Sequence, residues 1–240
     1  MESSEERIRN RPLHNMFTSL PPRYDLINRI ITLGFDKRWR REAAKACLVS
    51  RPARVVDLCC GTGDLALDFR KLGGNDLEII GLDFSGSMLK KAAQKAASSA
   101  GRISFVHGEV GSLPFRSRCF DCVGISFAFR NLTHNNPMAQ KHLAEIFRIL
   151  REDGRLVIVE SSQPRAKLTR ELYHLFLHIF AAQMGAIIAR NRAAYRYLAQ
   201  SAIRFYDPLQ LTELLKDTGF RQVSFRPLFL GATCIHEAIR

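Results

Sequence analysis

The chain has 240 residues, 46% of them hydrophobic, which is enough for the core of one large domain or two small ones. Lysine and arginine outnumber the acids by 36 to 23, and the net charge of +13 favours a polyanionic partner, either nucleic acid or an anionic membrane surface, with a merely basic soluble protein as the alternative. The six cysteines stand at irregular positions, which excludes the disulfide framework of a small secreted protein and indicates a reducing, cytoplasmic location.

The first 52 residues are mostly helical in pattern, and their charged start, MESSEERIRN, lacks the apolar core of a signal peptide. From residue 53 onward, short apolar runs alternate with amphipathic ones. The apolar runs predict strands at 53–58, 77–83, 102–108, 120–126 and 155–161, and the amphipathic segments predict helices after the first strand, at 85–101 and at 137–151. This alternation is typical of a doubly wound parallel sheet.

The last third of the chain departs from this rhythm. Residues 166–204 are helical in pattern with no strand among them, and a short helix at 207–217 and two β-like runs at 220–227 and 232–239 follow. Two strands joined by so tight a connection form an antiparallel hairpin. We therefore expect an α/β fold with a mainly parallel seven-stranded sheet, an antiparallel C-terminal hairpin, N-terminal helices and a late helical insertion.

One apolar segment, LFLHIFAAQMGAIIA at 175–189, invites comparison with a membrane span. It is interrupted by His178 and Gln183 and is shorter than the roughly 20 apolar residues that a spanning helix requires. We expect a buried helix or a lid over an apolar ligand instead. Glu171, His174 and His178 share one helical face at a spacing that resembles metal ligands, but their neighbours are apolar, and we expect a polar stripe and no metal site.

A glycine-rich loop, CCGTGD, joins the first predicted strand to its helix. The backbone at Gly61 and Gly63 can approach a ligand closely, and the N-terminus of the following helix offers N–H groups. Asp83 ends the second strand, where a carboxylate binds the two hydroxyls of a ribose. The loop formally fits the dinucleotide fingerprint G-x-G-x-x-A, but Asp57 before it and Asp64 within it would repel a pyrophosphate. The same two carboxylates suit the ammonium and sulfonium groups of S-adenosylmethionine.

The D-x-x-x-G-x-G arrangement that starts at Asp57, followed by the acid after the second strand, resembles motif I and its partner in the class I methyltransferases. The segment GEVGSLPFRSRCFDCV at 108–123 is similar to the same superfamily, in which an acidic or amide residue meets the adenine amino group. Glu109 and Val110 stand at those positions, whereas a turn with a buried Phe115 would explain only the Leu-Pro-Phe part. The resemblance implies a Rossmann-like fold and S-adenosyl-L-methionine as the cofactor.

Three further segments carry a more specific resemblance: MFTSLPPRYDLINRIITLGFDKRWRRE at 16–42, SFAFRNL at 126–132 and AYRYLAQSAIRF at 194–205. Together with the glycine loop they run nearly the whole length of the chain. They are similar to the ubiquinone/menaquinone biosynthesis C-methyltransferases, the UbiE/MenG family. That family transfers a methyl group to a ring carbon of a reduced polyprenyl quinone precursor. The resemblance favours conversion of demethylmenaquinol to menaquinol, with the choice between a naphthoquinol and a benzoquinol left open.

The resemblance also implies a set of residues that contact S-adenosylmethionine. They are Asp57, Gly61, Thr62, Gly63, Asp83, Glu109, Val110 and Ser126. Two positions depart from the family pattern. Cys59 and Cys60 replace the usual glycine or alanine, so the loop must accommodate a side chain there. Glu109 and Val110 replace the usual Asp-Ala or Asn-Ala, and glutamate reaches one methylene further.

The fourth predicted strand is followed by Arg130 and Asn131, at the edge where open α/β sheets bind their ligands. A ring carbon becomes nucleophilic when a neighbouring hydroxyl loses its proton. Arginine stays protonated and cannot be the base, but its N–H donors can hold the developing phenolate oxygen. We therefore expect a catalytic Arg130 that orients and stabilises the quinol oxygen, with Asn131 assisting. The alternative is a structural arginine that pairs with an acid such as Asp25 or Glu160.

The surroundings of the site follow from the same resemblance. Tyr24, Trp39 and Tyr195 are expected as pocket walls, and the proton acceptor stays open between His134, Tyr195, Tyr197 and water. The late helices would cover a pocket for a long isoprenoid tail. Such a substrate lives in a bilayer, so the cations of one short helix are candidates for contact with anionic lipid, with a solvated basic face as the alternative. These cations are Lys37, Arg38, Arg40, Arg41 and Lys45.

We expect a single methyltransferase domain over residues 1–240. It divides into an N-terminal helical extension (1–52), an S-adenosylmethionine-binding core (53–161), a helical substrate cap (162–206) and a closing helix with the hairpin (207–240). The expected location is cytoplasmic. Peripheral contact with the inner face of the membrane and homo-oligomerisation are left open.

The basic charge and motif I leave an RNA methyltransferase as a rival hypothesis. The sequence reveals no appended RNA-binding module, and Phe129-Arg130-Asn131 stands where amino-group methyltransferases place an Asn-Pro-Pro-aromatic loop. Nucleic acid is therefore not the expected partner. A methyltransferase for another small phenol is the nearest rival, and a protein that binds the cofactor without transferring its methyl group is a third possibility.

Overall fold

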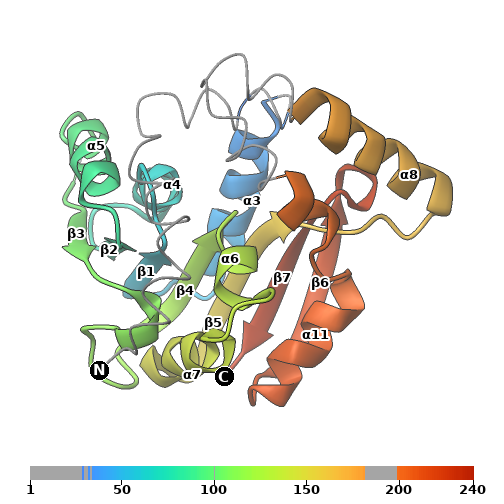
Figure 1. Cartoon of the computed structure of the whole chain (residues 1–240). Coiled ribbons are helices and arrows are strands. Elements are labelled where there is room, and N and C mark those ends of the chain that lie inside the picture. Colours follow the sequence, from blue (N-terminus) through green and yellow to red (C-terminus); the bar gives the residue numbers. More distant parts are fainter. Residues whose placement is uncertain (1–28, 30–31, 33, 100, 182–198) are drawn as a thin grey trace.

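The computed structural model describes residues 29, 32, 34–99, 101–181 and 199–240. Within these ranges seven strands form one sheet in the order β3-β2-β1-β4-β5-β7-β6, with helices packed around it (Figure 1). β1 to β5 pair in parallel, whereas β7 is antiparallel to both β5 and β6. The strands are β1 (Arg54–Leu58), β2 (Glu78–Asp83), β3 (Ser104–His107), β4 (Phe120–Ser126), β5 (Leu150–Ser161), β6 (Arg221–Leu228) and β7 (Thr233–Ile239). The predicted architecture with its antiparallel hairpin is confirmed.

Different helices cover the two faces of the sheet, because successive strand residues point to opposite sides. Val55 belongs to a buried cluster with α3 (Asp36–Leu48) and α4 (Asp64–Gly73). The next residue, Val56, belongs to a second cluster with α7 (Ala139–Ile149) and α11 (Pro208–Asp217). The further described elements are α5 (Gly86–Ala96), α6 (Phe129–Thr133), α8 (Lys167–Phe176), the 3₁₀-helices η1 (Val110–Ser112) and η3 (Phe229–Gly231), and the π-helical turn η2 (Leu177–Ala181).

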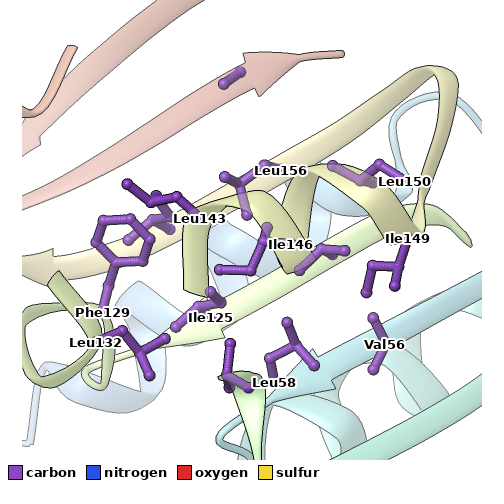
Figure 2. Close-up of a cluster of buried hydrophobic side chains, with 14 of the residues drawn as sticks. Val56, Leu58, Ile125, Phe129, Leu132, Leu143, Ile146, Ile149, Leu150 and Leu156 are labelled. Carbon is purple, nitrogen blue, oxygen red and sulfur yellow. The ribbon is translucent and has the colours of Figure 1, made fainter. Parts of the chain in front are cut away.

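The second cluster also fixes the start of α6. Three residues of α7 at helical spacing point into it, Leu143, Ile146 and Ile149, and Figure 2 shows them above the strands of the sheet. The fully buried Phe129, which opens α6, joins the same cluster. This anchoring holds the backbone of the following residue, Arg130, at the carboxyl end of β4.

One strand begins earlier than the sequence pattern predicts. β5 starts at Leu150, which pairs with Phe120, whereas the predicted strand covers 155–161. The register of the β4–β5 ladder shifts just after this pair. Gly154 lies in the shifted stretch, where a Cβ would stand 2.7 Å from the Arg151 carbonyl oxygen. Gly154 marks this tight bend in the sequence. The strand residues before the bend depend on pairing with Phe120, which is distant in sequence.

Some sequence predictions concern residues outside the described ranges. These are Tyr24, Asp25, Tyr195 and Tyr197, together with residues 182–198 of the expected late helices. Of that late stretch, the structure describes α8, η2 and the residues from Ala199 onward. Within the described part of the chain, we find no helix that combines the length and the apolarity needed to traverse a bilayer.

We expect Gly124→Ala to lower the free energy of unfolding by about 1–3 kcal/mol through overpacking. Gly124 lies in the central strand β4, and a Cβ there would stand 2.8 Å from Phe69 Cζ and 3.0 Å from Leu65 Cδ2 of α4. Urea denaturation measures the change. Gly86→Ala is the matched control, because a Cβ at Gly86 meets no heavy atom within 4 Å. Equal stability of the two variants would contradict the close approach of α4 to β4.

The stability of the fold is expected to depend on pH through His236 of β7. Its Nε2 donates to the Pro208 carbonyl oxygen at 3.1 Å, and Nδ1 is buried with no hydrogen-bond partner among the described residues. Burial lowers the pKa of His236 from 6.5 to about 4. The unfolded chain binds this proton more readily, so stability is full above pH 6.5 and falls by about 3 kcal/mol as the pH drops to 4.

Urea denaturation of the wild type and of His236→Gln across this pH range isolates the contribution, because the variant has no titrating group at that position. The wild type should lose more stability than the variant between pH 6.5 and pH 4. Parallel pH profiles would show that His236 titrates alike in the folded and unfolded chains.

Candidate active site

Three residues of the loop between β1 and α4 have left-handed backbone conformation. Cys59, Gly61 and Gly63 have φ values of 56°, 53° and 79°. Glycine adopts this conformation freely, whereas a non-glycine residue is disfavoured there by about 1–2 kcal/mol. Cys59, one of the positions at which the sequence departs from the family pattern, is therefore a position at which glycine would relieve strain. The loop accommodates the cysteine, with its side chain half-buried against the core.

Asp57, near the end of β1, holds the loop against the helix that follows it. Its carboxylate is buried, and Oδ2 accepts the Ala66 N–H at 3.0 Å. Burial raises the pKa of Asp57 well above its usual range, against the opposing effect of the Ala66 hydrogen bond. A positively charged ligand near this carboxylate would favour its ionised form, because an opposite charge counteracts desolvation.

Asp83, the last residue of β2, ties the loop to the neighbouring strand. Its Oδ2 accepts the Gly61 N–H at 2.8 Å and its Oδ1 accepts the Ser85 N–H at 2.9 Å. Burial raises the pKa of Asp83, and the two N–H groups act in the opposite direction. Each carboxylate oxygen has two lone pairs, so both can accept a further hydrogen bond. This geometry suits the two hydroxyls of a ribose.

The two loop glycines serve different purposes. A Cβ at Gly61 would meet no heavy atom within 4 Å, so the loop faces open space there. A Cβ at Gly63 would stand 3.0 Å from the Ala92 Cβ, so this glycine lets the loop pack against α5. An open loop backbone with the acids Asp57 and Asp83 beside it fits a nucleoside that carries a positive charge. The described residues therefore fit S-adenosylmethionine.

Asp64, expected to help attract a positive ligand, lies instead within a network of ion pairs. Lys95 of α5 contacts Asp64 Oδ1 at 2.5 Å, and Arg40 of α3 contacts Oδ2 at 3.2 Å. The same Lys95 ammonium donates to Thr62 Oγ1 at 2.8 Å. Thr62 is buried, and Arg40 also pairs with Asp36. The network joins α3, α4 and α5 around the loop. No local sequence signal predicts that Lys95 takes part in it.

The other expected cofactor residues follow the next strands of the same edge. Glu109 is exposed and comes directly before η1, whose first residue, Val110, is buried. Ser126 ends β4 and is half-buried. Because the sheet order runs β3-β2-β1-β4, the segment after β3 and the ends of the other three strands meet at one edge. The structure thus brings the predicted set to the same edge of the sheet.

Arg130 pairs with the buried carboxylate of Glu160 at the end of β5. Its Nη1 contacts Glu160 Oε1, its backbone N–H donates to Oε2 at 3.2 Å, and its Nε donates to Ser201 Oγ at 3.2 Å. Of the two acids considered as structural partners, Glu160 contacts Arg130, and Asp25 lies outside the described residues. Asn131 lies next in α6, and its carbonyl oxygen accepts from the Asn136 side chain at 2.8 Å.

Tyr173 of α8 lies beside this pair and was not singled out from the sequence. Burial raises the pKa of its phenol to about 12, while the nearby Arg130 charge and a hydrogen bond with Ser161 act in the opposite direction. Glu160 raises the same pKa further. The late helix therefore reaches the polar pair at the ends of β4 and β5. Only the folded chain reveals this proximity, because no motif links the residues.

Two other candidate side chains lie in aromatic surroundings. Trp39, an expected pocket wall, is buried, with its ring centroid 6.3 Å from Phe127 and 5.9 Å from Phe229. His134, a candidate proton acceptor, contacts Tyr206 edge-to-face at 5.3 Å, and burial lowers its pKa, with nearby Arg204 acting in the same direction. A neutral imidazole is the form that can accept a proton.

The expected polar stripe on the late helix is partly engaged in hydrogen bonding. His174 Nε2 contacts Gln163 Oε1 at 2.8 Å, and Glu171 is exposed and lies 4.0 Å from Lys167. Among the described residues, no three His, Cys, Asp or Glu side chains are grouped so that they could hold a metal ion.

Comparisons with known proteins relate the chain to one methyltransferase family. A model of the ubiE/COQ5 methyltransferase family matches residues 1–240. The demethylmenaquinone methyltransferase of Deinococcus radiodurans is 36% identical over 227 residues, which cover 95% of this chain and 92% of that protein. The ubiquinone/menaquinone biosynthesis C-methyltransferase UbiE of Geotalea daltonii is 34% identical over 226 residues, with 93% and 94% covered.

Solved structures share the fold. A Thermotoga maritima protein described as a SAM-dependent methyltransferase and possible histamine N-methyltransferase superposes with a TM-score of 0.66 at 17% identity. The match covers 94% of this chain and 98% of that one. At this identity the likeness concerns the arrangement of strands and helices, and the substrate named for that protein is its own.

Proposed function

The chain belongs to the ubiE/COQ5 methyltransferase family and is an S-adenosylmethionine-dependent methyltransferase, and on that premise we propose that it methylates a ring carbon of demethylmenaquinol to give menaquinol. The observation that carries the proposal is the edge formed by β1, β2, β4 and β5. It holds the acid-flanked glycine loop and, on the adjacent strands, the buried pair of Arg130 and Glu160.

The cofactor end of the site is assigned to the residues around the loop. Bound S-adenosylmethionine supplies an electrophilic methyl group on a sulfonium. Asp83 binds the ribose hydroxyls, and Asp57 balances the positive charge. Gly61 and Gly63 shape the loop, and further contacts come from Thr62, Glu109, Val110 and Ser126.

The substrate end is assigned to the ends of β4 and β5. Arg130, with Asn131 assisting, holds the quinol oxygen next to the ring carbon that is methylated. Charge that develops on this oxygen is stabilised by a guanidinium already oriented by Glu160, so little reorganisation is required during the reaction. The proton acceptor remains open between His134, the tyrosines of the late helices and water.

A polyprenyl substrate requires an apolar cover and access to lipid. The cover over the isoprenoid tail is assigned to the late segment 162–206, of which the structure describes 162–181 and 199–206. Four cations of α3 are exposed and face outward, where they suit contact with anionic lipid: Lys37, Arg38, Arg41 and Lys45. Arg40, expected among them, is buried in its ion pairs and takes no part.

Transfer of a labelled methyl group from S-adenosylmethionine tests the proposal. Chemically reduced demethylmenaquinone, its oxidised form, a reduced demethylated benzoquinone and total RNA are compared in mild detergent. The expected result is label on a ring carbon of the naphthoquinol, with none in the oxidised quinone or RNA. Preferred labelling of the benzoquinol, of RNA or of neither quinol would overturn the assigned substrate.

A further inference from the structure

The outward side of the late helix carries a continuous apolar line. Leu168, Leu172 and Leu175 of α8 and Ile179 of η2 are 70%, 59%, 53% and 50% exposed. At 100° per residue the three leucines of α8 point within about 60° of one another, and Ile179 follows in the π-helical turn. We call these four residues the outer stripe. Large exposed apolar groups in one line mark an interaction surface more often than scattered ones.

The opposite side of the same helix is already anchored to the protein. Leu177 is buried against Ala199 and Ala202. His174 contacts Gln163, which in turn donates to the Ala202 carbonyl oxygen at 2.8 Å. The helix therefore has an inner apolar side that holds it in place and an outer stripe that contributes little to the fold.

A second exposed apolar group lies at the turn between β6 and β7. Phe229 and Leu230 are 47% and 81% exposed, and both have left-handed backbone conformation, with φ of 44° and 56°. A Cβ at the next residue, Gly231, would stand 3.2 Å from Pro164 Cα, so this hairpin tip lies beside the segment that leads into α8 (Figure 1). We call Phe229 and Leu230 the hairpin tip.

Exposed cations surround these apolar groups. Arg165 and Lys167 stand at the start of α8, and the Lys167 side chain is 83% exposed. The ring of Phe35 lies 5.2 Å from that of Phe229 and precedes α3, which exposes Lys37 and Arg38. The whole chain carries a net charge of +13. Apolar side chains flanked by cations are the combination that binds an anionic bilayer surface.

We propose that the outer stripe and the hairpin tip form a docking surface that inserts into the interface of an anionic lipid bilayer. The inference rests on the proposed function in one respect: a polyprenyl quinol substrate would enter the site from the same bilayer. A second copy of the chain is a poorer occupant. A stable dimer buries about 800 Å² per partner, more than the six exposed side chains of this surface supply, and two surfaces rimmed with cations repel each other.

Sedimentation with vesicles tests the proposal on the full-length protein. Vesicles of phosphatidylglycerol and phosphatidylcholine in equal parts are compared with pure phosphatidylcholine. We expect the wild type to bind the anionic vesicles, and Leu168→Ser/Leu172→Ser to lower the partition coefficient about 100-fold, because two inserted side chains are lost. Val49→Ser/Leu209→Ser is the matched control, because Val49 and Leu209 are exposed to a similar degree, 69% and 54%, outside this surface.

Equal binding of the test and control variants would overturn the proposal. So would a wild-type dimer that Leu168→Ser/Leu172→Ser converts to a monomer in analytical ultracentrifugation, which would assign the surface to a second copy. Methyl transfer to a short-chain, water-soluble quinol is measured in parallel without vesicles. Failure of that reaction alone would count against the proposed function and leave the docking surface supported.

Discussion

Asp83→Ala is expected to weaken S-adenosylmethionine binding by about 100- to 10,000-fold, because two hydrogen bonds to a charged group are worth about 1.5–3 kcal/mol each. The Asp83 carboxylate also holds the backbone of Gly61 and Ser85, so the variant loses both the ribose contact and the fixed shape of the loop. Isothermal titration calorimetry with S-adenosylmethionine measures the change in Kd.

Two further variants separate these contributions. Asp83→Asn keeps the shape of the side chain and one acceptor, and we expect it to bind with intermediate affinity. Asp64→Ala removes an acid whose partners are Lys95 and Arg40, so its effect on Kd should be less than about tenfold, in line with the value of a partly exposed ion pair. An unchanged Kd in Asp83→Ala would show that neither the Asp83 carboxylate nor its hold on the loop contributes to cofactor binding.

The parallel core of the fold was predictable from sequence because each strand is a short apolar run with glycine or polar residues at its ends. The sequence also predicted the hairpin, since the two β-like runs after residue 219 have too short a connection for a parallel crossover. The early start of β5 was not predictable. It depends on Leu150 meeting Phe120 across a shifted register, a contact between residues on different strands.

The site was predictable where residue position alone determines the geometry. Asp57 and Asp83 lie at the carboxyl edge because they stand next to last and last in two parallel strands, and the sheet order brings those strands together. Long-range electrostatic partners were not predictable in this way. The ion pairs of Asp64 with Lys95 and Arg40 join three helices, and nothing in the local pattern distinguishes this acid from one that meets a ligand.

Arg130→Ala is expected to lower kcat by about 100- to 1000-fold, the loss found when one donor to a developing oxyanion is removed. It should leave the Kd for S-adenosylmethionine within a small factor, because the Arg130 side chain contacts Glu160 and Ser201, and the assigned cofactor contacts other than Ser126 lie in or after β1, β2 and β3. The same change removes the partner of the buried Glu160 and should lower the free energy of unfolding by about 3–5 kcal/mol. Single-turnover kinetics, calorimetry and urea denaturation measure the three quantities separately.

Loss of stability and loss of chemistry are separable at this residue because the two roles require different properties of the side chain. Arg130→Met/Glu160→Gln removes both charges, so no unpaired carboxylate remains buried and much of the stability should return. Arg130→Lys keeps the charge opposite Glu160 but lacks the planar fork of donors.

If Arg130 holds the quinol oxygen, the double variant stays inactive although it is folded, and the lysine variant keeps only part of the rate. If instead the arginine serves only to neutralise Glu160, activity returns together with stability in both variants. The pairing with Glu160 is thus compatible with a catalytic and with a purely structural Arg130. The two roles differ in whether the rate recovers together with stability or only when the guanidinium is present.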